Sequence, residues 1–193
     1  MAVKGKQEAR SRRLFAASDQ HLHERFAFRN IRKEESGQAA RIERICFPPN
    51  EACSMEMIVS RIERVPELFL VAEDRGTGNL AGFLSGLATD ESAFRDDFFS
   101  DASLYDPNGT NIMLLGLDVL PDYRGQGLAR ELMYEYLRRE CEKGTQCVRL
   151  TCLPAKIEMY KKMGFCDEGV SQSVWGGEQW HEMSCELNGP RKM

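Results

Sequence analysis

The 193-residue sequence has three histidines and two tryptophans, and it contains no long hydrophobic run. No apolar stretch approaches the roughly 20 residues that cross a bilayer. The basic N-terminus also lacks the apolar core of a secretory signal. A formal net charge of −4 gives no indication of a nucleic-acid surface. We therefore expect one folded domain in the cytoplasm, with no membrane and no nucleic-acid partner.

The seven cysteines include no Cys-x-x-Cys pair, and their number is odd. They lie in apolar or alternating runs, which is typical of reduced, packed cysteines in a cytosolic protein. His21 and His23 form no ligand set with them. We predict no metal site.

Short runs of strand and helix periodicity follow one another from Phe26 onward. Strands are expected at residues 26–31, 67–74, 79–88, 111–120, 147–152, 165–175 and 179–187, and helices at 36–46, 54–65, 128–141 and 155–163. The RGTG segment at 75–78 predicts a hairpin between two of these strands. The polar stretch 89–110 predicts a long surface loop that borders a substrate site.

The most informative segment is LDVLPDYRGQGLARELM, at residues 117–133. A buried strand stops at Pro121, a glycine-rich turn follows, and a helix begins, so that unpaired N–H groups and the helix dipole favour a phosphate. A P-loop requires Lys and Ser/Thr after Gly127, where this chain has Leu128 and Ala129. A dinucleotide fingerprint requires Gly or Ala at the position of Arg130. Both of those motifs are excluded.

Arg124, Gly127 and Ala129 match the pattern Arg/Gln-x-x-Gly-x-Gly/Ala, and with them the sequence resembles the GNAT acetyltransferase superfamily. The YKKMGF segment at 160–165 follows in the family's order, and the resemblance covers residues 28–187. It implies an α/β (α+β) fold, a single GNAT-like domain with a central mixed, largely antiparallel sheet flanked by helices. We assign residues 26–188 to this domain and residues 1–25, which are rich in Lys and Arg, to an N-terminal tail.

The resemblance also implies acetyl-CoA as co-substrate and N-acetyl transfer by direct attack in a ternary complex. The residues expected to bind the cofactor are Leu117, Asp118, Val119, Arg124, Gly125, Gln126, Gly127, Leu128, Ala129 and Tyr160. The turn would hold the pyrophosphate, and the strand backbone would pair with the pantetheine arm. Tyr160 lies where the family commonly places a general acid, although a residue that only packs against the cofactor would occupy the same position.

Two segments resemble the microbial and fungal arylalkylamine N-acetyltransferases: FPPNEACS at 47–54, and the C-terminal stretch that ends in GGEQWHEMSCEL. This likeness implies that Phe47, Pro48 and Pro49 border the amine pocket and that Trp180 supplies a wall. Aromatic walls suit an aryl or alkyl amine. Each of these residues taken alone is equally consistent with a core position.

The general base of vertebrate members does not carry over, because Met113 and Leu115 stand where those members have two histidines. Glu51 matches a glutamate used as base in the insect branch and is the first candidate, with a solvent-exposed or helix-capping carboxylate as the alternative. Asp118, a carboxylate in an apolar strand, is the second candidate unless a bulge turns it outward. His181 would point to the face opposite Trp180 in a regular strand.

The expected acceptor is the primary amine of a small molecule, an arylalkylamine or a polyamine. Two alternatives remain open: an acetyltransferase for a protein lysine or N-terminus, and a non-catalytic sensor that binds acetyl-CoA. We expect a monomer or a weak homodimer, because no segment specifies an interface.

Overall fold

One mixed sheet organises the computed structural model, which describes residues 18–187. The strands are β1 (Phe26–Asn30), β2 (Phe69–Asp74), β3 (Leu80–Thr89), β4 (Asn111–Val119), β5 (Cys147–Cys152), β6 (Cys166–Val170) and β7 (His181–Glu186). Their order in the sheet is β1-β2-β3-β4-β5-β7-β6. Every neighbouring pair is antiparallel except β4 and β5, which run parallel across the α6 crossover. The predicted mixed, largely antiparallel sheet flanked by helices is confirmed.

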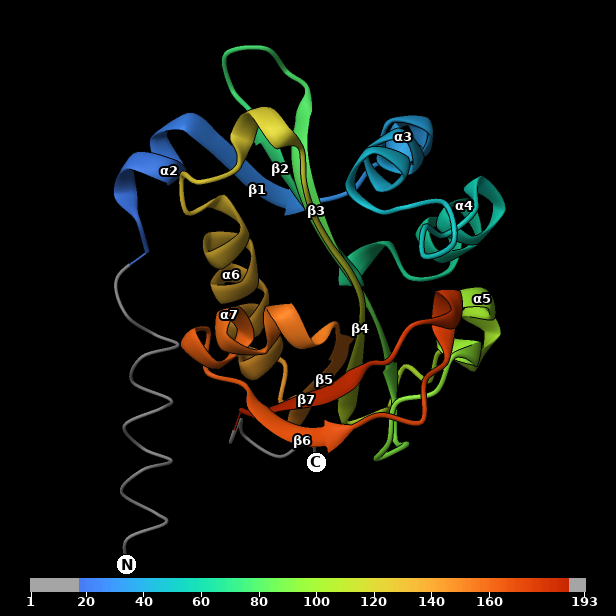
Figure 1. The fold of residues 1–193 in the computed structure, drawn as a ribbon. Helices are drawn as coiled ribbons and strands as arrows, with labels where there is room; N and C mark the ends of the chain where they lie inside the picture. Colours follow the sequence, from blue (N-terminus) through green and yellow to red (C-terminus); the bar gives the residue numbers. More distant parts are fainter. Residues whose placement is uncertain (1–17, 188–193) are drawn as a thin grey trace, which may run out of the picture.

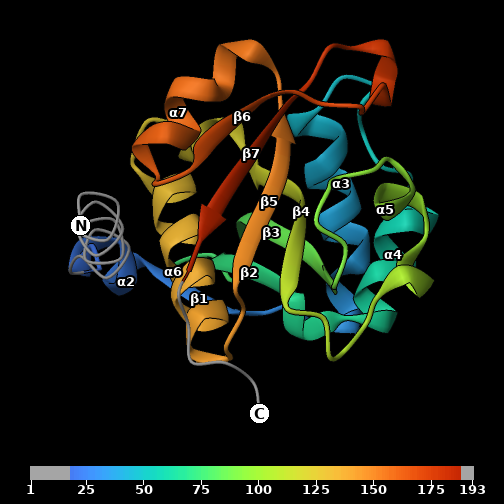
Figure 2. The ribbon, with the colours of Figure 1, turned by 90° about the horizontal axis from the view of Figure 1, so that it is seen from below.

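Helices cover both faces of this sheet (Figures 1 and 2). They are α2 (Gln20–Arg25), α3 (Ser36–Cys46), α4 (Met55–Arg64), α5 (Asp97–Ser100), α6 (Leu128–Glu142) and α7 (Ile157–Lys162). The α6 and α7 helices lie on one face, and α3 and α4 lie on the other. Each face has its own hydrophobic cluster. Because both faces are covered, β3 is buried along its whole length.

Local sequence signals explain where several helices begin and end. The hydroxyl of Ser54 accepts a hydrogen bond from the N–H of Met57, which caps α4 as predicted. Pro66 follows the end of that helix and starts a short 3-10 turn. The strand, helix and strand formed by β4, α6 and β5 also agree with the expected pattern.

The predicted tail is shorter than expected at its C-terminal end. Residues 20–25 form α2, whose Leu22 is buried in the cluster around α6. The Nε2 atom of His23 lies 2.8 Å from Oε1 of Glu131 on α6. This segment is too short to show a helical periodicity in the sequence, so only the structure reveals that it forms a helix and packs against α6. Residues 1–17 of the predicted tail lie outside the described residues.

The stretch 89–110 is not the polar surface loop that its composition predicts. It contains α5 and buries three aromatic residues, Phe94, Phe98 and Phe99. The sequence did not reveal this small core, because its few apolar residues are scattered among many polar ones. The strand expected at 165–175 is also too long, because β6 ends at Val170 and the chain then turns through residues 171–180 before β7.

The β4 and β5 strands separate within the sheet. The two strands pair only from Asn111 to Met113 on β4. On the β3 side, Ser85 pairs with Gly116 and Gly86 pairs with Leu114, so Leu115 is an extra residue at a bulge. The bulge and the separation leave the C-terminal half of β4 without a strand partner on the β5 side. Across residues 18–187, no helix is long and apolar enough to span a membrane.

Candidate active site

A cavity of about 630 Å³ opens where β4 and β5 separate. It is lined from both faces of the sheet, by Leu128 and Met133 of α6 on one side and by Glu43 and Cys46 of α3 on the other. Leu114 to Leu117 of β4 and Leu150 to Leu153 of β5 form its walls. The cavity therefore passes through the sheet, where an extended ligand can pair with the free strand edge.

The glycine-rich turn lies at the α6 end of the cavity. Gly125 has a φ of 73° and Gly127 has a φ of 88°, a left-handed backbone that glycine adopts without strain. Gly127 is the N-cap of α6, and no side chain caps that helix. Within residues 18–187, the N–H groups from Gly125 to Arg130 have no protein acceptor. These donors and the dipole of a 15-residue helix fit the phosphate groups of a CoA ligand.

Positive side chains surround this end of the cavity. Arg124, Arg130 and Lys156 contribute to the lining. The Nε atom of Arg124 also donates a 2.8 Å hydrogen bond to the carbonyl of Val119, which ties the turn to the end of β4. Arg124 therefore has a structural contact as well as a charge that favours phosphate.

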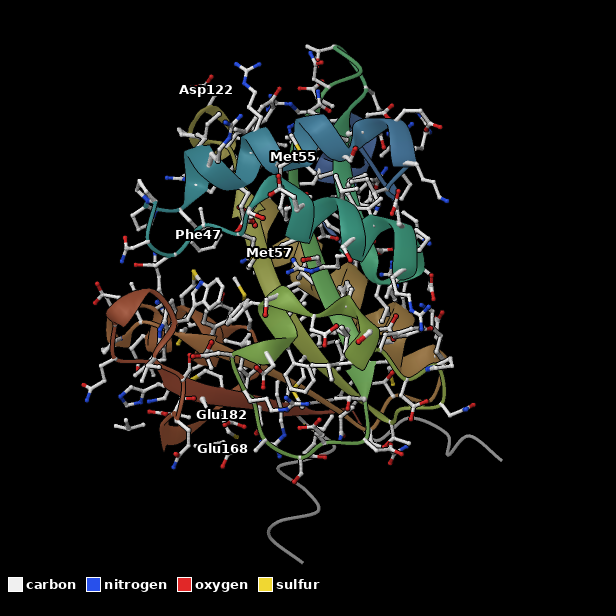
Figure 3. All side chains as sticks on the ribbon, turned by 90° about the vertical axis from the view of Figure 1, so that its right-hand side faces the viewer. Phe47, Met55, Met57, Asp122, Glu168 and Glu182 are labelled. Atoms are coloured by element: carbon white, nitrogen blue, oxygen red, sulfur yellow. The ribbon has the colours of Figure 1, made fainter. Side chains whose placement is uncertain are left out.

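Four aromatic residues, Phe47, Phe99, Trp175 and Trp180, line the cavity away from the glycine-rich turn, and we define them as the aromatic wall. Phe99 and Trp175 stack with their ring centroids 4.7 Å apart. The indole N–H of Trp175 donates to the carbonyl of Glu51 at 2.7 Å, and that of Trp180 donates to the carbonyl of Trp175 at 2.8 Å. Figure 3 shows Phe47 where the chain leaves α3, facing the segment between β6 and β7.

Three segments supply this wall and are joined to one another by hydrogen bonds. They lie between α3 and α4, between β3 and β4, and between β6 and β7. The amide of Asn50 donates to the carbonyl of Gly176 at 2.8 Å, and the carboxylate of Asp96 accepts from the N–H of Val174 at 3.0 Å. Gly176 has a φ of 64°, and a Cβ on it would lie 2.8 Å from the carbonyl oxygen of Asn50. Only glycine allows this close approach of the two loops.

Tyr160 of α7 lines the cavity beside Cys152 and Met163. Its ring packs edge-on against Phe165, with the centroids 5.8 Å apart. Burial raises the pKa of the Tyr160 phenol, and the nearby Cys152 and Asp118 raise it further. The phenol therefore keeps its proton at neutral pH and has one to donate.

Glu51 lies in the loop between α3 and α4 and is only half-buried at the edge of the cavity. Partial burial raises the pKa of its carboxyl, and Glu178 raises it further. A carboxylate at this position favours a cationic ligand at the cavity entrance.

A second carboxylate, Glu43 of α3, also lines the cavity and is 2% exposed. Its Oε1 accepts a 2.9 Å hydrogen bond from the N–H of Cys53, whereas its Oε2 has no partner among the described residues. Asp118 of β4 is fully buried beside it, and neither of its carboxylate oxygens has a hydrogen-bond partner in the described part of the chain. Desolvation raises the pKa of both carboxyls. The positive charge of Arg61 in α4, which is also buried, lowers the pKa of both carboxyls.

Most of the predicted site residues line this one cavity, and three do not. Phe47, Pro48, Glu51, Leu117, Val119, Arg124, Gly125, Gly127, Leu128, Ala129, Tyr160 and Trp180 contribute to the lining. Pro49 and Gln126 are exposed, and Gln126 accepts a hydrogen bond from Arg25. Asp118 lies behind Gly116 rather than in the lining, because the bulge leaves its side chain on the α3 face.

Sequence reasoning missed Phe99, Trp175 and Glu43. Trp175 was assigned to a strand, although the two glycines that follow it indicate a turn. Glu43 falls at the helical spacing of Ala39 and Cys46 on the buried face of α3, and an acidic residue on an apolar face was the available signal. His181, as expected, lies away from the cavity, with its Nδ1 atom 3.0 Å from Asp167.

The family follows from comparison with known proteins. A model of the acetyltransferase (GNAT) family matches residues 36–165 of the chain. The chain belongs to this family, a class of enzymes that depends on acetyl-CoA. A search of curated proteins finds no match. In the described residues, no group of three or more His, Cys, Asp or Glu side chains is arranged to hold a metal ion.

Solved structures with the same fold cover nearly the whole described domain. The loading GNATL domain of CurA from Lyngbya majuscula has a TM-score of 0.73 at 15% identity, over 84% of this chain and 98% of that chain. The ribosomal-protein-S18-alanine N-acetyltransferase from Escherichia coli has a TM-score of 0.62 at 17% identity, over 86% and 97%. The protein yncA from Salmonella typhimurium, solved with its cofactor acetyl-CoA, has a TM-score of 0.61 at 16% identity, over 87% and 97%. At these identities the likeness concerns the fold alone.

Proposed function

We propose that the protein transfers the acetyl group of acetyl-CoA to the primary amine of a small molecule, with an arylalkylamine as the preferred class. The observation that carries this proposal is the single cavity with a phosphate-binding turn at one end and the aromatic wall at the other. The turn suits the phosphate groups of the cofactor, and the aromatic wall suits an apolar amine.

The cofactor end supports the proposal through its unpaired donors and its charge. The N–H groups from Gly125 to Arg130 would hold the pyrophosphate, and Arg130 and Lys156 would neutralise the remaining phosphate charge. The free edge of β4 near Leu117 and Val119 would pair with the amide groups of the pantetheine arm. Bound acetyl-CoA supplies an activated acetyl thioester.

The reaction needs a neutral amine, stabilisation of the negative charge on the carbonyl oxygen, and a proton for the departing sulfur. A pocket carboxylate takes one proton from the ammonium, and Glu51 is the carboxylate that the sequence predicts for this role. A backbone N–H at the β4 bulge near Leu117 donates to the carbonyl oxygen. As the C–N bond forms and the C–S bond breaks, Tyr160 gives its phenolic proton to the sulfur.

The acceptor end favours a small aryl or alkyl amine over a peptide. The segments that carry Phe99, Trp175 and Trp180 are joined by hydrogen bonds and ring stacking, so the side chains of the wall are held in fixed positions. Glu51 at the edge adds attraction for an ammonium group. A polypeptide acceptor requires an open groove, whereas the fixed aromatic side chains offer an apolar surface of the size of one aryl group.

The test is release of CoA thiol from acetyl-CoA in the presence of tryptamine, phenylethylamine, spermidine or putrescine, each offered separately. Saturable turnover on an arylalkylamine supports the proposal. Tight acetyl-CoA binding without turnover on any amine or on a lysine peptide would instead support a sensor.

A further inference from the structure

Glu43 is a buried acid that the sequence-based mechanism leaves unused. It is 2% exposed, lines the cavity, and has one carboxylate oxygen without a hydrogen-bond partner among the described residues. An unpartnered carboxylate oxygen in a buried position is unfavourable for the fold alone. Because Glu43 lines the cavity, this oxygen can accept a hydrogen bond from a bound ligand.

The free oxygen lies close to the strand segment at which acetyl transfer is expected. A Cβ built on Gly116 would lie 3.7 Å from Oε2 of Glu43 and 3.0 Å from Oδ2 of Asp118. Gly116 itself lines the cavity, next to the bulge at Leu115. Both carboxyl groups therefore lie next to Gly116 beside the β4 bulge, whereas Glu51 lies in the loop after α3 and is half-buried.

Charged and titratable groups from three elements surround Glu43 and Asp118, the buried acid pair. The charged and titratable groups that face the pair are Arg61 of α4, Cys53 before α4, Cys46 of α3 and Arg124 after β4. Arg61 donates to the hydroxyl of Ser85 at 3.1 Å and to the carbonyl of Phe99 at 3.1 Å, so it is held in place. Desolvation of both acids and the repulsion of Asp118 by Glu43 favour a state in which the pair keeps one proton and carries one negative charge.

We propose that Glu43 is a catalytic residue that binds the acceptor ammonium and takes its first proton, with Asp118 as a positioning residue that shares a proton with it. The proposal rests on the proposed function and moves the base from the edge of the cavity to its centre. It also specifies the substrate class as an amine that enters in its protonated, cationic form.

Glu43 takes one proton from the R–NH₃⁺ group and later releases it to solvent. The nitrogen forms the C–N bond, the C–S bond breaks, and the sulfur takes the phenolic proton of Tyr160. A second proton from the nitrogen restores the phenol, and the third stays on the amide product.

Glu43→Gln tests the first role, with Glu63→Gln, an exposed glutamate of α4 outside the cavity lining, as the matched control. Glu51→Gln tests the rival base. Glutamine retains an acceptor for the N–H of Cys53 but cannot take a proton. We expect kcat/KM at neutral pH to fall about 100-fold, which is the usual contribution of a general base. The loss should shrink as the pH rises, because the neutral amine then forms in solution. Glu51→Gln should keep the acidic limb of the profile. The proposal is wrong if Glu51→Gln removes that limb and Glu43→Gln preserves it.

A binding measurement keeps the inference testable apart from catalysis. The protein loaded with CoA is titrated with tryptamine and with its neutral alcohol analogue tryptophol. Glu43→Gln should weaken tryptamine binding about tenfold and leave tryptophol binding unchanged. Equal effects on both ligands, or none on either, would overturn the proposal even if the wild-type protein turned over no amine.

Asp118→Asn provides a second variant in case Glu43→Gln does not fold. The ionisation of Asp118 depends on Glu43, so removing this carboxyl should change the position of the acidic limb of kcat/KM on the pH axis. A merely structural role for Asp118 would lower the rate at every pH and leave the limb in place, which would contradict the shared proton. Failure of wild-type turnover on every amine is a separate outcome that counts against the proposed function.

Discussion

At the residue scale, the chemistry depends on a few side chains whose surroundings differ from water. Tyr160 is the clearest case, because burial raises the pKa of its phenol and the group stays protonated throughout the neutral range. Glu43 and Asp118 are acids whose burial favours the protonated form. The proposed acetyl transfer uses a buried phenol as the proton donor and a buried carboxylate as the proton acceptor.

Tyr160→Phe should lower kcat about 100-fold and leave acetyl-CoA affinity unchanged. The variant loses the proton donor, whereas its ring can still pack against Phe165. Steady-state kinetics and a CoA titration measure the two quantities. An unchanged kcat would mean that the phenol only packs against the cofactor.

At the element scale, the sequence predicted what local periodicity determines. The alternating and helical runs gave most strands and helices, and Pro121 with its following glycines located the turn before α6. The stacking of Phe99 on Trp175 joins residues 76 positions apart, and no local pattern specifies such a contact. The separation of β4 from β5 likewise depends on long-range pairing. The glycine-rich turn could therefore be located from the sequence, whereas the contacts within the aromatic wall could not.

Gly127→Ala tests the turn as an element. Alanine in a left-handed backbone costs about 1 kcal/mol, and the turn can relieve that strain by rotating its N–H groups away from the phosphate. We expect the dissociation constant for acetyl-CoA to rise about fivefold, the equivalent of that energy. Isothermal titration calorimetry measures it.

Gly37→Ala is the matched control for this substitution. Gly37 is exposed in α3, and a Cβ on it would have no atom within 4 Å. The control should keep its cofactor affinity and gain up to about 1 kcal/mol of stability, because alanine is the better helix former. If both variants bound acetyl-CoA as the wild-type protein does, the turn would not be the phosphate site.

At the scale of the whole molecule, the buried acids make stability depend on pH. The pKa of Asp118 in the folded state lies well above its ordinary value, chiefly because of desolvation and then because of Glu43. As the pH rises, the unfolded chain releases this proton first. The stabilisation is therefore complete below the unfolded-state pKa and is lost as the pH rises through the folded-state pKa.

Asp118→Asn should consequently melt a few degrees above the wild-type protein at pH 7, and the difference should shrink near pH 4. Asparagine cannot ionise, so the variant does not lose the stability that the wild-type protein loses as the pH rises. Thermal melts at the two pH values measure the difference, with Asp122→Asn, an exposed residue labelled in Figure 3, as the control. A difference of the same size at both pH values would contradict the buried charge.

The most direct test of the central claim compares kcat/KM for tryptamine with kcat/KM for a lysine peptide at saturating acetyl-CoA. Because the aromatic wall lines the acceptor end of the cavity, we predict a preference for tryptamine of at least about 100-fold. Equal values, or a preference for the peptide, would contradict the assignment of a small amine as the acceptor.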